Sequence, residues 1–216
     1  GNLTNLEQLD LGRNYIDYIG ALGGLTNLQT LDLSVNFISD IGALGNLTNL
    51  QTLYLSYNEI SDISALGNLT NLEQLDLGRN YIDYDYIVAL GNLTNLTELN
   101  LSNNRISYIS VLGNLTNLQT LDLSDNWIHK IVALGNLTNL TELNLSNNRI
   151  SYISVLGNLT NLQTLDLSDN EISDISALES LSGLGWLDLS YNNLIEQQVE
   201  ELRQKLPQAQ IRYQIY

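Results

Sequence analysis

The side chains that most often carry catalysis are scarce in this chain of 216 residues. It has no cysteine, and its single histidine, His129, follows Ser124 and Asp125 closely. A serine, a histidine and an acid can act as nucleophile, base and orienting group, but only in a geometry that nothing in this spacing provides. We therefore predict that His129 is an exposed loop residue and that the protein is not an enzyme.

Carboxylates are the abundant chemical group. The chain has 24 Asp and Glu against 8 Lys and Arg, which gives a net charge of −16. This charge repels phosphate backbones and excludes nucleic acid as a partner. Regularly spaced aspartates could form an acidic stripe for a basic partner or for calcium. No spacing gathers the several oxygens that calcium needs, so we favour a solvated polar surface and predict no metal and no cofactor.

The aspartates belong to a repeating unit with the pattern L-x-x-L-x-L-x-x-N. Successive asparagines are 22 residues apart, except that Asn104 follows Asn80 by 24. The leucines alternate as in a short, half-buried strand, and the later apolar spacing near three predicts a tight helical return. The nine asparagines are Asn14, Asn36, Asn58, Asn80, Asn104, Asn126, Asn148, Asn170 and Asn192.

This unit resembles the leucine-rich repeat family, in the short form found in bacterial internalins and in a regulatory subunit of protein phosphatase 1. The resemblance covers residues 1–194. It implies an α/β solenoid, a curved right-handed superhelix with short parallel strands on the concave face and 3-10 or irregular returns on the convex face. It also implies inward-pointing asparagines. The unit supports stacking independently, because one unit cannot bury its leucines alone.

The pattern changes after residue 194. Residues 195–206, IEQQVEELRQKL, have the apolar spacing of an amphipathic helix, Pro207 ends it, and QIRYQIY alternates as a strand. We therefore divide the chain into a nine-unit array, 1–194, with one unit of 24 residues, and a C-terminal cap, 195–216. No matching cap precedes the first unit, so we expect either that a cap has been left off or that the first strand is an open edge, able to pair with another copy.

Aromatic residues gather on the loop that follows each strand, mainly in the first four units. Arg105 falls between Tyr81 and Trp127 in one column, so cation–π contacts of about 0.5–1 kcal/mol each could hold this edge without a ligand. Neighbouring columns are aromatic as well, and rigid aromatic surfaces are typical of recognition sites. We favour a binding patch over self-packing. The predicted partner-binding residues are Phe37, Tyr54, Tyr57, Tyr81, Tyr84, Tyr86, Arg105 and Trp127.

The two extra residues lie in NYIDYDYIVAL, residues 80–90, where another unit has NYIDYIGAL. We expect Tyr84 and Tyr86 to stand out from the loop edge as a recognition loop. The flanking Asp83 and Asp85 would favour a partner with Lys or Arg. A tolerated longer turn is the alternative, since two added residues cost little loop entropy.

Two blocks of the sequence are duplicated without change. Residues 91–126 are identical to 135–170, and residues 1–18 to 67–84. With no Cys and no Met, this favours a designed or consensus-built protein over a recent duplication. A sequon at Asn100 within a strand disfavours a eukaryotic secretory origin, because a glycan would obstruct the sheet.

We therefore expect a non-enzymatic binding or scaffold solenoid. Its partner would be a protein or peptide, with a basic one favoured, bound through the concave face and the loop edge of the Tyr-rich first half. No membrane segment or leader is apparent, so a membrane is not expected as a partner and the location is otherwise open. The main alternative is a designed repeat protein without a natural ligand, self-associating through its N-terminal edge. Phosphatase regulation and bacterial adhesion follow only from fold resemblance.

Overall fold

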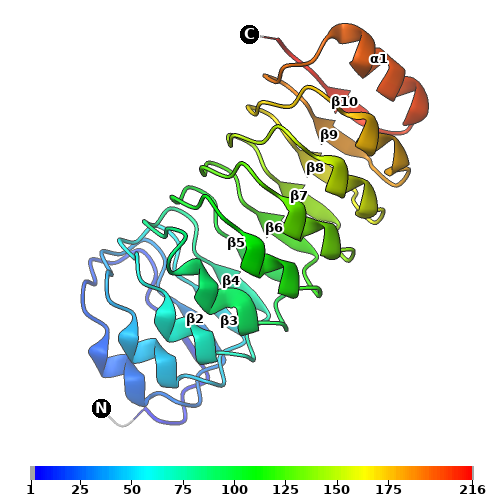
Figure 1. Cartoon of the computed structure of the whole chain (residues 1–216). Helices are drawn as coiled ribbons and strands as arrows, with labels where there is room; N and C mark the ends of the chain where they lie inside the picture. The colour runs from blue at the N-terminus through cyan, green and yellow to red at the C-terminus, as the bar shows by residue number, and fades with distance from the viewer. Residues whose placement is uncertain (1–2, 216) are drawn as a thin grey trace.

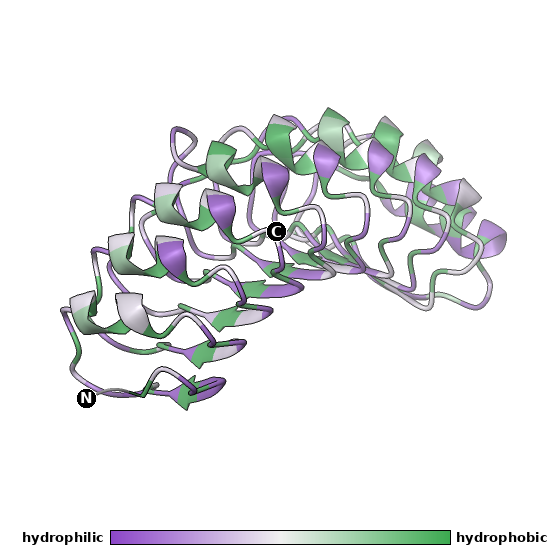
Figure 2. Cartoon of the chain, turned by 90° about the horizontal axis from the view of Figure 1, so that it is seen from below, coloured by the Kyte–Doolittle hydropathy of each residue, from purple (hydrophilic) through white to green (hydrophobic). Residues whose placement is uncertain are grey.

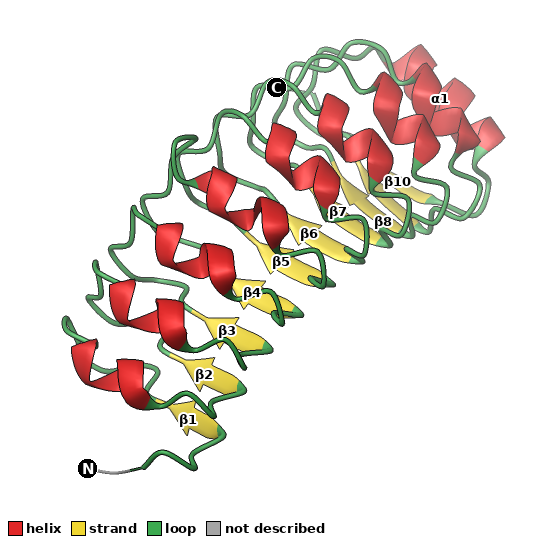
Figure 3. Cartoon of the chain, turned by 60° about the horizontal axis from the view of Figure 1, so that its bottom comes forward, coloured by secondary structure: helices red, strands yellow, loops and turns green. Residues whose placement is uncertain are grey.

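Each repeat forms one coil of a curved solenoid in the computed structural model, which describes residues 3–215 (Figure 1). A short strand lies on one side of each coil, and a 3-10 turn lies on the opposite side (Figure 3). The coils stack in chain order, with the strands along the inside of the curve. This architecture confirms the α/β solenoid predicted from the repeat.

The described strands pair in parallel in a single open sheet of ten, in the order of the sequence. Each strand has three residues, with one apolar residue at its centre. The strands are β1 (Gln8–Asp10), β2 (Thr30–Asp32), β3 (Thr52–Tyr54), β4 (Gln74–Asp76), β5 (Glu98–Asn100), β6 (Thr120–Asp122), β7 (Glu142–Asn144), β8 (Thr164–Asp166), β9 (Trp186–Asp188) and β10 (Gln210–Arg212).

The outer face carries a column of 3-10 turns. Along each turn and its flanking residues, the apolar residues recur about every three positions, as the sequence pattern predicts. The unit with the two-residue insertion has the longest turn. The turns are η1 (Gly20–Gly24), η2 (Gly42–Asn46), η3 (Ser64–Asn68), η4 (Ile87–Asn92), η5 (Ser110–Asn114), η6 (Val132–Asn136), η7 (Ser154–Asn158) and η8 (Ser176–Ser180).

The sheet register places equivalent residues of neighbouring units side by side. Tyr54 of β3, for example, pairs with Asp32 of β2 and with Asp76 of β4. Inside the coils, Leu121 and Ile128 are buried together with their counterparts in every neighbouring unit. The hydrophobic colour accordingly recurs at the same places from coil to coil in Figure 2. The core is continuous because each coil covers the apolar faces of the next.

The regular spacing of the asparagines produces a buried hydrogen-bond ladder. Asn126 Nδ2 donates to the carbonyl oxygens of Leu101, Leu123 and Ser124 at 3.0–3.2 Å. Its Oδ1 accepts a 3.0 Å hydrogen bond from the backbone N–H of Ile106. One amide thus satisfies backbone groups of two units, as a buried polar group must. The predicted inward asparagine ladder is present.

A second asparagine ladder, which the sequence analysis did not predict, runs along the segment between each 3-10 turn and the next strand. Asn139 Nδ2 donates to the carbonyl of Thr116 at 2.8 Å, and Asn161 donates to that of Thr138 at the same distance. These side chains are exposed, so the ladder adds inter-unit bonds outside the core. The LGNLTNL sequence therefore holds neighbouring units together as well as forming the convex side of each coil.

The C-terminal cap continues the sheet and covers its last coil. Helix α1 (Glu196–Lys205) buries Val199 and Leu202, and β10 pairs with β9. Arg212 lies 3.4 Å from the nearly buried Asp188, which neutralises part of the charge at that end. Ile195, expected on the apolar face of the helix, is instead 61% exposed because it precedes the first helical turn. Between residues 3 and 215, no helix has the length and apolar character needed to span a membrane.

The inner asparagine ladder is expected to dominate stability. In Asn126→Ala, the buried Ile106 N–H loses its acceptor. The three carbonyl groups each lose one donor but keep another, from Asn104, Asn148 or the Asn103 N–H. We expect a loss of about 2–4 kcal/mol in unfolding free energy, mainly from the unsatisfied N–H. Asn139→Ala removes one exposed bond and should cost about 0.5–1.5 kcal/mol. Urea unfolding followed by circular dichroism measures both. Equal losses in the two variants would contradict the assigned role of the inner ladder.

Candidate recognition site

The residue before each inner-ladder asparagine has a left-handed backbone conformation. Its φ lies between 52° and 58° in every unit, although none of these residues is glycine. We call it the left-handed position. The chain leaves the strand there and must turn to bring the asparagine amide inward. Asn and Asp adopt this conformation more readily than other non-glycine residues, whereas a β-branched residue is strained there.

The occupants of the left-handed position divide the array in two. Units five to eight have the tolerant residues Asn103, Asp125, Asn147 and Asp169, whereas the first four units have Arg13, Val35, Tyr57 and Arg79. The first four units therefore give up local backbone stability that the next four retain. The ninth unit again has a tyrosine, Tyr191, beside the cap.

The same four side chains line a groove of about 630 Å³ along the loop edge, the segment between each strand and the next 3-10 turn. We call it the aromatic groove. It is lined by inner-ladder asparagines, by the left-handed residues and by the residues just after the asparagines. The lining residues are Arg13, Asn14, Tyr15, Val35, Asn36, Phe37, Tyr57, Asn58, Glu59, Arg79, Asn80, Tyr81 and Asn103.

Contacts between neighbouring units order the rings of the groove. Tyr15 stacks on Phe37 with ring centroids 6.2 Å apart and planes inclined by 22°. The guanidinium of Arg79 lies 4.7 Å from the centre of the Tyr57 ring. Phe37 and Tyr57 nevertheless remain about half exposed, at 51% and 50%. Side chains of neighbouring units thus pack on one another, but ring surface remains available.

Three of the predicted binding residues, Phe37, Tyr57 and Tyr81, line this groove. Arg105 lies next to it, with its guanidinium 4.8 Å from the centre of the Tyr81 ring. Trp127 is half exposed but is not part of the lining. The groove also contains Arg13, Tyr15, Val35 and Arg79, which were not predicted as binding residues. They could have been found from the repeat, because Tyr15 occupies the repeat position of Tyr81 and the other three occupy that of Tyr57.

The two-residue insertion forms a turn before η4. Its Asp85 N–H donates to Asp83 Oδ1 at 3.0 Å. Tyr84 is exposed and meets the ring of Tyr108 edge-on at 5.9 Å. The expectation that Tyr86 also stands out from the edge is wrong, because its half-buried side chain packs against the core. The insertion therefore presents one aromatic ring outward and uses the other as an internal support.

Tyr84 belongs to a separate row of rings. Tyr108 meets His129 edge-on, with the ring centroids 5.2 Å apart. His129 is thus partly covered by a neighbouring ring, and it is only partly exposed rather than freely exposed as the sequence suggested. Neither Tyr84 nor His129 lines the aromatic groove.

The aspartate column on the concave face serves the turn that follows each strand. Asp32 Oδ1 accepts a 2.8 Å hydrogen bond from the Ser34 N–H, and Asn100 Oδ1 accepts one of 2.9 Å from the Ser102 N–H. Asp and Asn are interchangeable here because either side chain supplies the acceptor. Among residues 3–215, no three His, Cys, Asp or Glu side chains are arranged to hold a metal ion. These bonds favour the structural interpretation of the acidic stripe.

Tyr54 breaks this turn-capping rule. Its side chain has no carboxylate for the Ser56 N–H, and its hydroxyl donates to Gln74 Oε1 at 3.3 Å. It contributes to a shallow concave hollow of about 310 Å³ beside Asp76 and Asn100. Tyr54, Tyr57 and Val35 therefore replace structurally preferred residues in two adjacent units.

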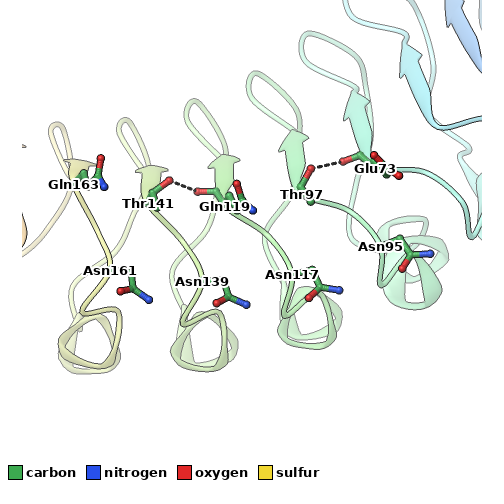
Figure 4. A pocket seen from close by; sticks show the side chains of 9 residues that line it. All are labelled: Glu73, Asn95, Thr97, Asn117, Gln119, Asn139, Thr141, Asn161 and Gln163. Carbon is green, nitrogen blue, oxygen red and sulfur yellow. Dashed lines mark hydrogen bonds between the residues drawn. The ribbon is translucent and has the colours of Figure 1, made fainter.

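A polar groove of about 600 Å³ lies at the opposite edge of the sheet, along the second asparagine ladder (Figure 4). It contains amides and hydroxyls in register, and Thr97 and Thr141 hydrogen-bond to backbone carbonyls of the preceding unit at 3.1 Å. Asn117 and Asn139 donate to the preceding unit as well. Because these groups already stabilise the stack, this groove is a weaker candidate for recognition.

The repeat pattern is matched by the sequence profile described as Leucine Rich repeats (2 copies). The matches cover residues 4–46, 48–86, 94–136, 116–158, 138–180 and 160–206. The chain belongs to the leucine-rich repeat family. Leucine-rich repeats are typically protein-interaction domains rather than enzymes. Comparison with curated protein sequences gives no significant match.

Solved leucine-rich repeat structures share the architecture. Internalin C2 of Listeria monocytogenes is 36% identical over 89% of this chain and 82% of its own, with a TM-score of 0.82. The Arabidopsis receptor kinase HAESA ectodomain, solved with a peptide hormone ligand, is 32% identical over 88% of this chain and 35% of its own, with a TM-score of 0.77. The GASSHO1/SCHENGEN3 ectodomain of Arabidopsis thaliana, in complex with Casparian strip integrity factor 2, is 28% identical over 97% of this chain and 27% of its own, with a TM-score of 0.81.

Replacing a strained residue at the left-handed position with a tolerant one should stabilise the protein. Val35→Asn places a tolerant residue where a β-branched one is strained, so we expect a gain of about 1 kcal/mol in unfolding free energy. The reverse substitution Asn147→Val introduces the same strain in unit seven and also removes the Asn147 hydrogen bond to Asp125, so it should cost more than the Val35→Asn substitution gains. Chemical denaturation reports both changes. A destabilising Val35→Asn substitution would show that the valine side chain contributes packing that outweighs its backbone strain.

The half-buried carboxyl of Asp166 should cost stability when it is ionised. Burial raises the pKa of Asp166 above its ordinary value of 3.8, although hydrogen bonds from Ser168 oppose this shift. The folded state then binds the proton more tightly than the unfolded state, so stability falls as pH rises from 3.8 through the raised pKa. Asp166→Asn keeps an acceptor, as Asn144 does for Ser146, but does not titrate.

Asp166→Asn should therefore be at least as stable as the wild type at pH 7. Its advantage should shrink as pH falls through the raised pKa towards 3.8, and it should be lost below 3.8, where the wild-type carboxyl is protonated in both states. Thermal melts across this pH range measure the difference. An advantage that grew on acidification would mean that the carboxylate is stabilised, not penalised, in the folded protein.

Proposed function

We propose that this protein is a binding solenoid that takes a protein or peptide segment into the aromatic groove of units one to four. The observation that carries the proposal is the placement of Arg13, Val35, Tyr57 and Arg79 at left-handed positions. These choices lower backbone stability, whereas the equivalent Asn or Asp of later units does not. Departures from the structurally preferred residue are expected where function is selected.

The physical character of the groove fits such a partner. Rigid, half-exposed rings supply large contact area at low entropic cost, and their stacking on neighbouring units holds them in place. The hollow at Tyr54 lies on the adjacent concave face and extends the surface available to a longer segment. Related ectodomains of this family hold peptide or protein ligands, which supports a protein partner for this chain as well.

A second candidate function is a consensus-built structural repeat without a natural ligand, in which the rings stabilise only one another. The unchanged sequence blocks, 91–126 and 135–170, favour it, as do the contacts between Tyr15 and Phe37. Self-association through the first strand would belong to this candidate and would appear as a mass that rises with protein concentration. Self-packing does not account for Val35, because a valine gains too little from contact with the rings to offset its backbone strain.

The two candidates predict opposite results for Tyr57→Asn. Under the binding proposal, this substitution lowers the backbone strain at the left-handed position but removes a central ring of the groove. We expect peptides selected from a display library on the wild-type protein to bind it at least about tenfold more weakly, while its urea midpoint does not fall. Tyr152→Asn is the matched control, because Tyr152 is an exposed tyrosine outside the groove, at 84% exposure.

Selected peptides that bind Tyr57→Asn as well as the wild type would refute the groove as the binding site. A library that yields no peptide at all, together with a clear fall in the urea midpoint of Tyr57→Asn, would support the structural candidate instead.

A further inference from the structure

The positive charges of the repeat array are confined to one surface. Between residues 1 and 194, every Lys and Arg lies on the loop edge, although this part of the chain is strongly acidic. The other three cations, Arg203, Lys205 and Arg212, lie in the cap and each pairs with an acid. The array's cations are Arg13, Arg79, Arg105, Lys130 and Arg149.

The aromatic groove receives the largest share of these charges. Arg13 and Arg79 are among its lining residues, whereas Glu59 is the single acid among them. Arg105 adds a third guanidinium above the Tyr81 ring at the rim. The groove is therefore locally cationic in a protein of net charge −16. Charge that opposes the overall sign and collects at one groove indicates complementarity to a partner of the opposite charge.

Ring contacts prepare two of the arginines to bind a carboxylate. Arg79 lies over Tyr57 and Arg105 over Tyr81, at 4.7 Å and 4.8 Å from the ring centres. A guanidinium uses its flat face in such a contact and keeps its in-plane N–H donors, whose fork matches a carboxylate. Among residues 3–215, the salt bridges within 4 Å involve only the arginines and lysine of the cap.

Building on the proposed function, we infer that the groove selects a segment with one carboxylate beside an apolar side chain. The apolar site is the stacked pair Tyr15 and Phe37, and the cationic site is formed by Arg79 and Arg105. Adjacent units are about 4.8 Å apart, and side chains on one face of an extended peptide are about 7 Å apart. The Arg79 guanidinium lies over the Tyr57 ring of the third unit, one unit beyond Phe37. An aromatic residue on Phe37 and an acid on Arg79 therefore match positions i and i+2 of a partner.

Only one acid should be favoured in the partner. The net charge of −16 repels a polyanionic chain, and this repulsion acts over longer distances than the contact with the arginines. The carboxylates of the inserted turn do not reverse the preference. Asp83 accepts a hydrogen bond from Asp85 within its own turn, and neither residue lines the groove. The basic partner suggested by the sequence is thus less well matched to the groove than an acidic one.

Three synthetic peptides test this inference with defined chemistry. They are acetylated and amidated, with the sequence Gly-Ser-Trp-Ser-X-Ser-Gly, where X is Glu, Gln or Lys. Isothermal titration calorimetry at physiological salt should show the Glu peptide binding about tenfold more tightly than the Gln peptide, with the Lys peptide weakest. Arg79→Gln should remove this preference, and Arg79→Lys should retain part of it because the charge remains without the fork.

The matched control is Arg149→Gln, which removes an exposed arginine of the same loop edge outside the groove and should leave the preference intact. Urea midpoints of the variants that equal the wild-type value would show that the fold is unchanged.

A Lys peptide that binds as tightly as the Glu peptide overturns the inference, and so does an acid preference that survives Arg79→Gln. Failure of all three peptides to bind overturns it too. If library-selected peptides then depend on Tyr57 but lack acids, the proposed function stands without this inference. If no library-selected peptide depends on Tyr57, both the inference and the proposed function are refuted.

Discussion

The inner asparagine ladder is the interaction on which the rest of the structure depends. From the second unit on, each amide ties the turn of its own unit to the backbone of the unit before it, as Asn126 does with Leu101 and Ile106. The amide can reach both only if the preceding residue turns the chain in a left-handed conformation. The ladder therefore imposes a strained residue on every unit, immediately beside the surface that a partner can reach.

This constraint explains why stability and recognition compete at the same place. Asn103 and Asn147 show the choice that favours the backbone, and Val35 and Tyr57 show the choice that favours surface chemistry. The strand side chains are under a similar constraint, since an Asp or Asn such as Asp32 caps the next turn and Tyr54 does not. A functional site in such a solenoid is recognised by where these two rules are broken, not by an unusual fold.

Much of the fold could be predicted from the sequence, because the period fixes the strand, the turn and the ladder together. The columns of the concave face, including Tyr54 between Asp32 and Asp76, follow directly from the register. The cap helix was also predictable from its apolar spacing, although the exposure of Ile195 shows that its first residue lies outside the helix. The second asparagine ladder was not predicted, since spacing alone does not show which way an exposed amide points.

The candidate site was predictable only in part. Composition drew attention to the rings of Phe37 and Tyr81, but the backbone conformation that makes Val35 and Arg79 informative is not visible in a sequence pattern. Tyr86 was misplaced for a related reason, because an inserted tyrosine can face the core or the solvent depending on how the longer turn closes. In the structure, Asp83 closes that turn and Tyr86 packs inward.

The claim that units one to four form the recognition surface is tested most directly by an amide chemical-shift map. A library-selected peptide would be titrated into isotope-labelled protein. The account predicts perturbed amides on the loop edge at residues 13–15, 35–37, 57–59, 79–81 and 103–105, with units six to eight unchanged. Perturbations centred on the polar groove of Asn117 and Asn139, or spread evenly along the array, would contradict it.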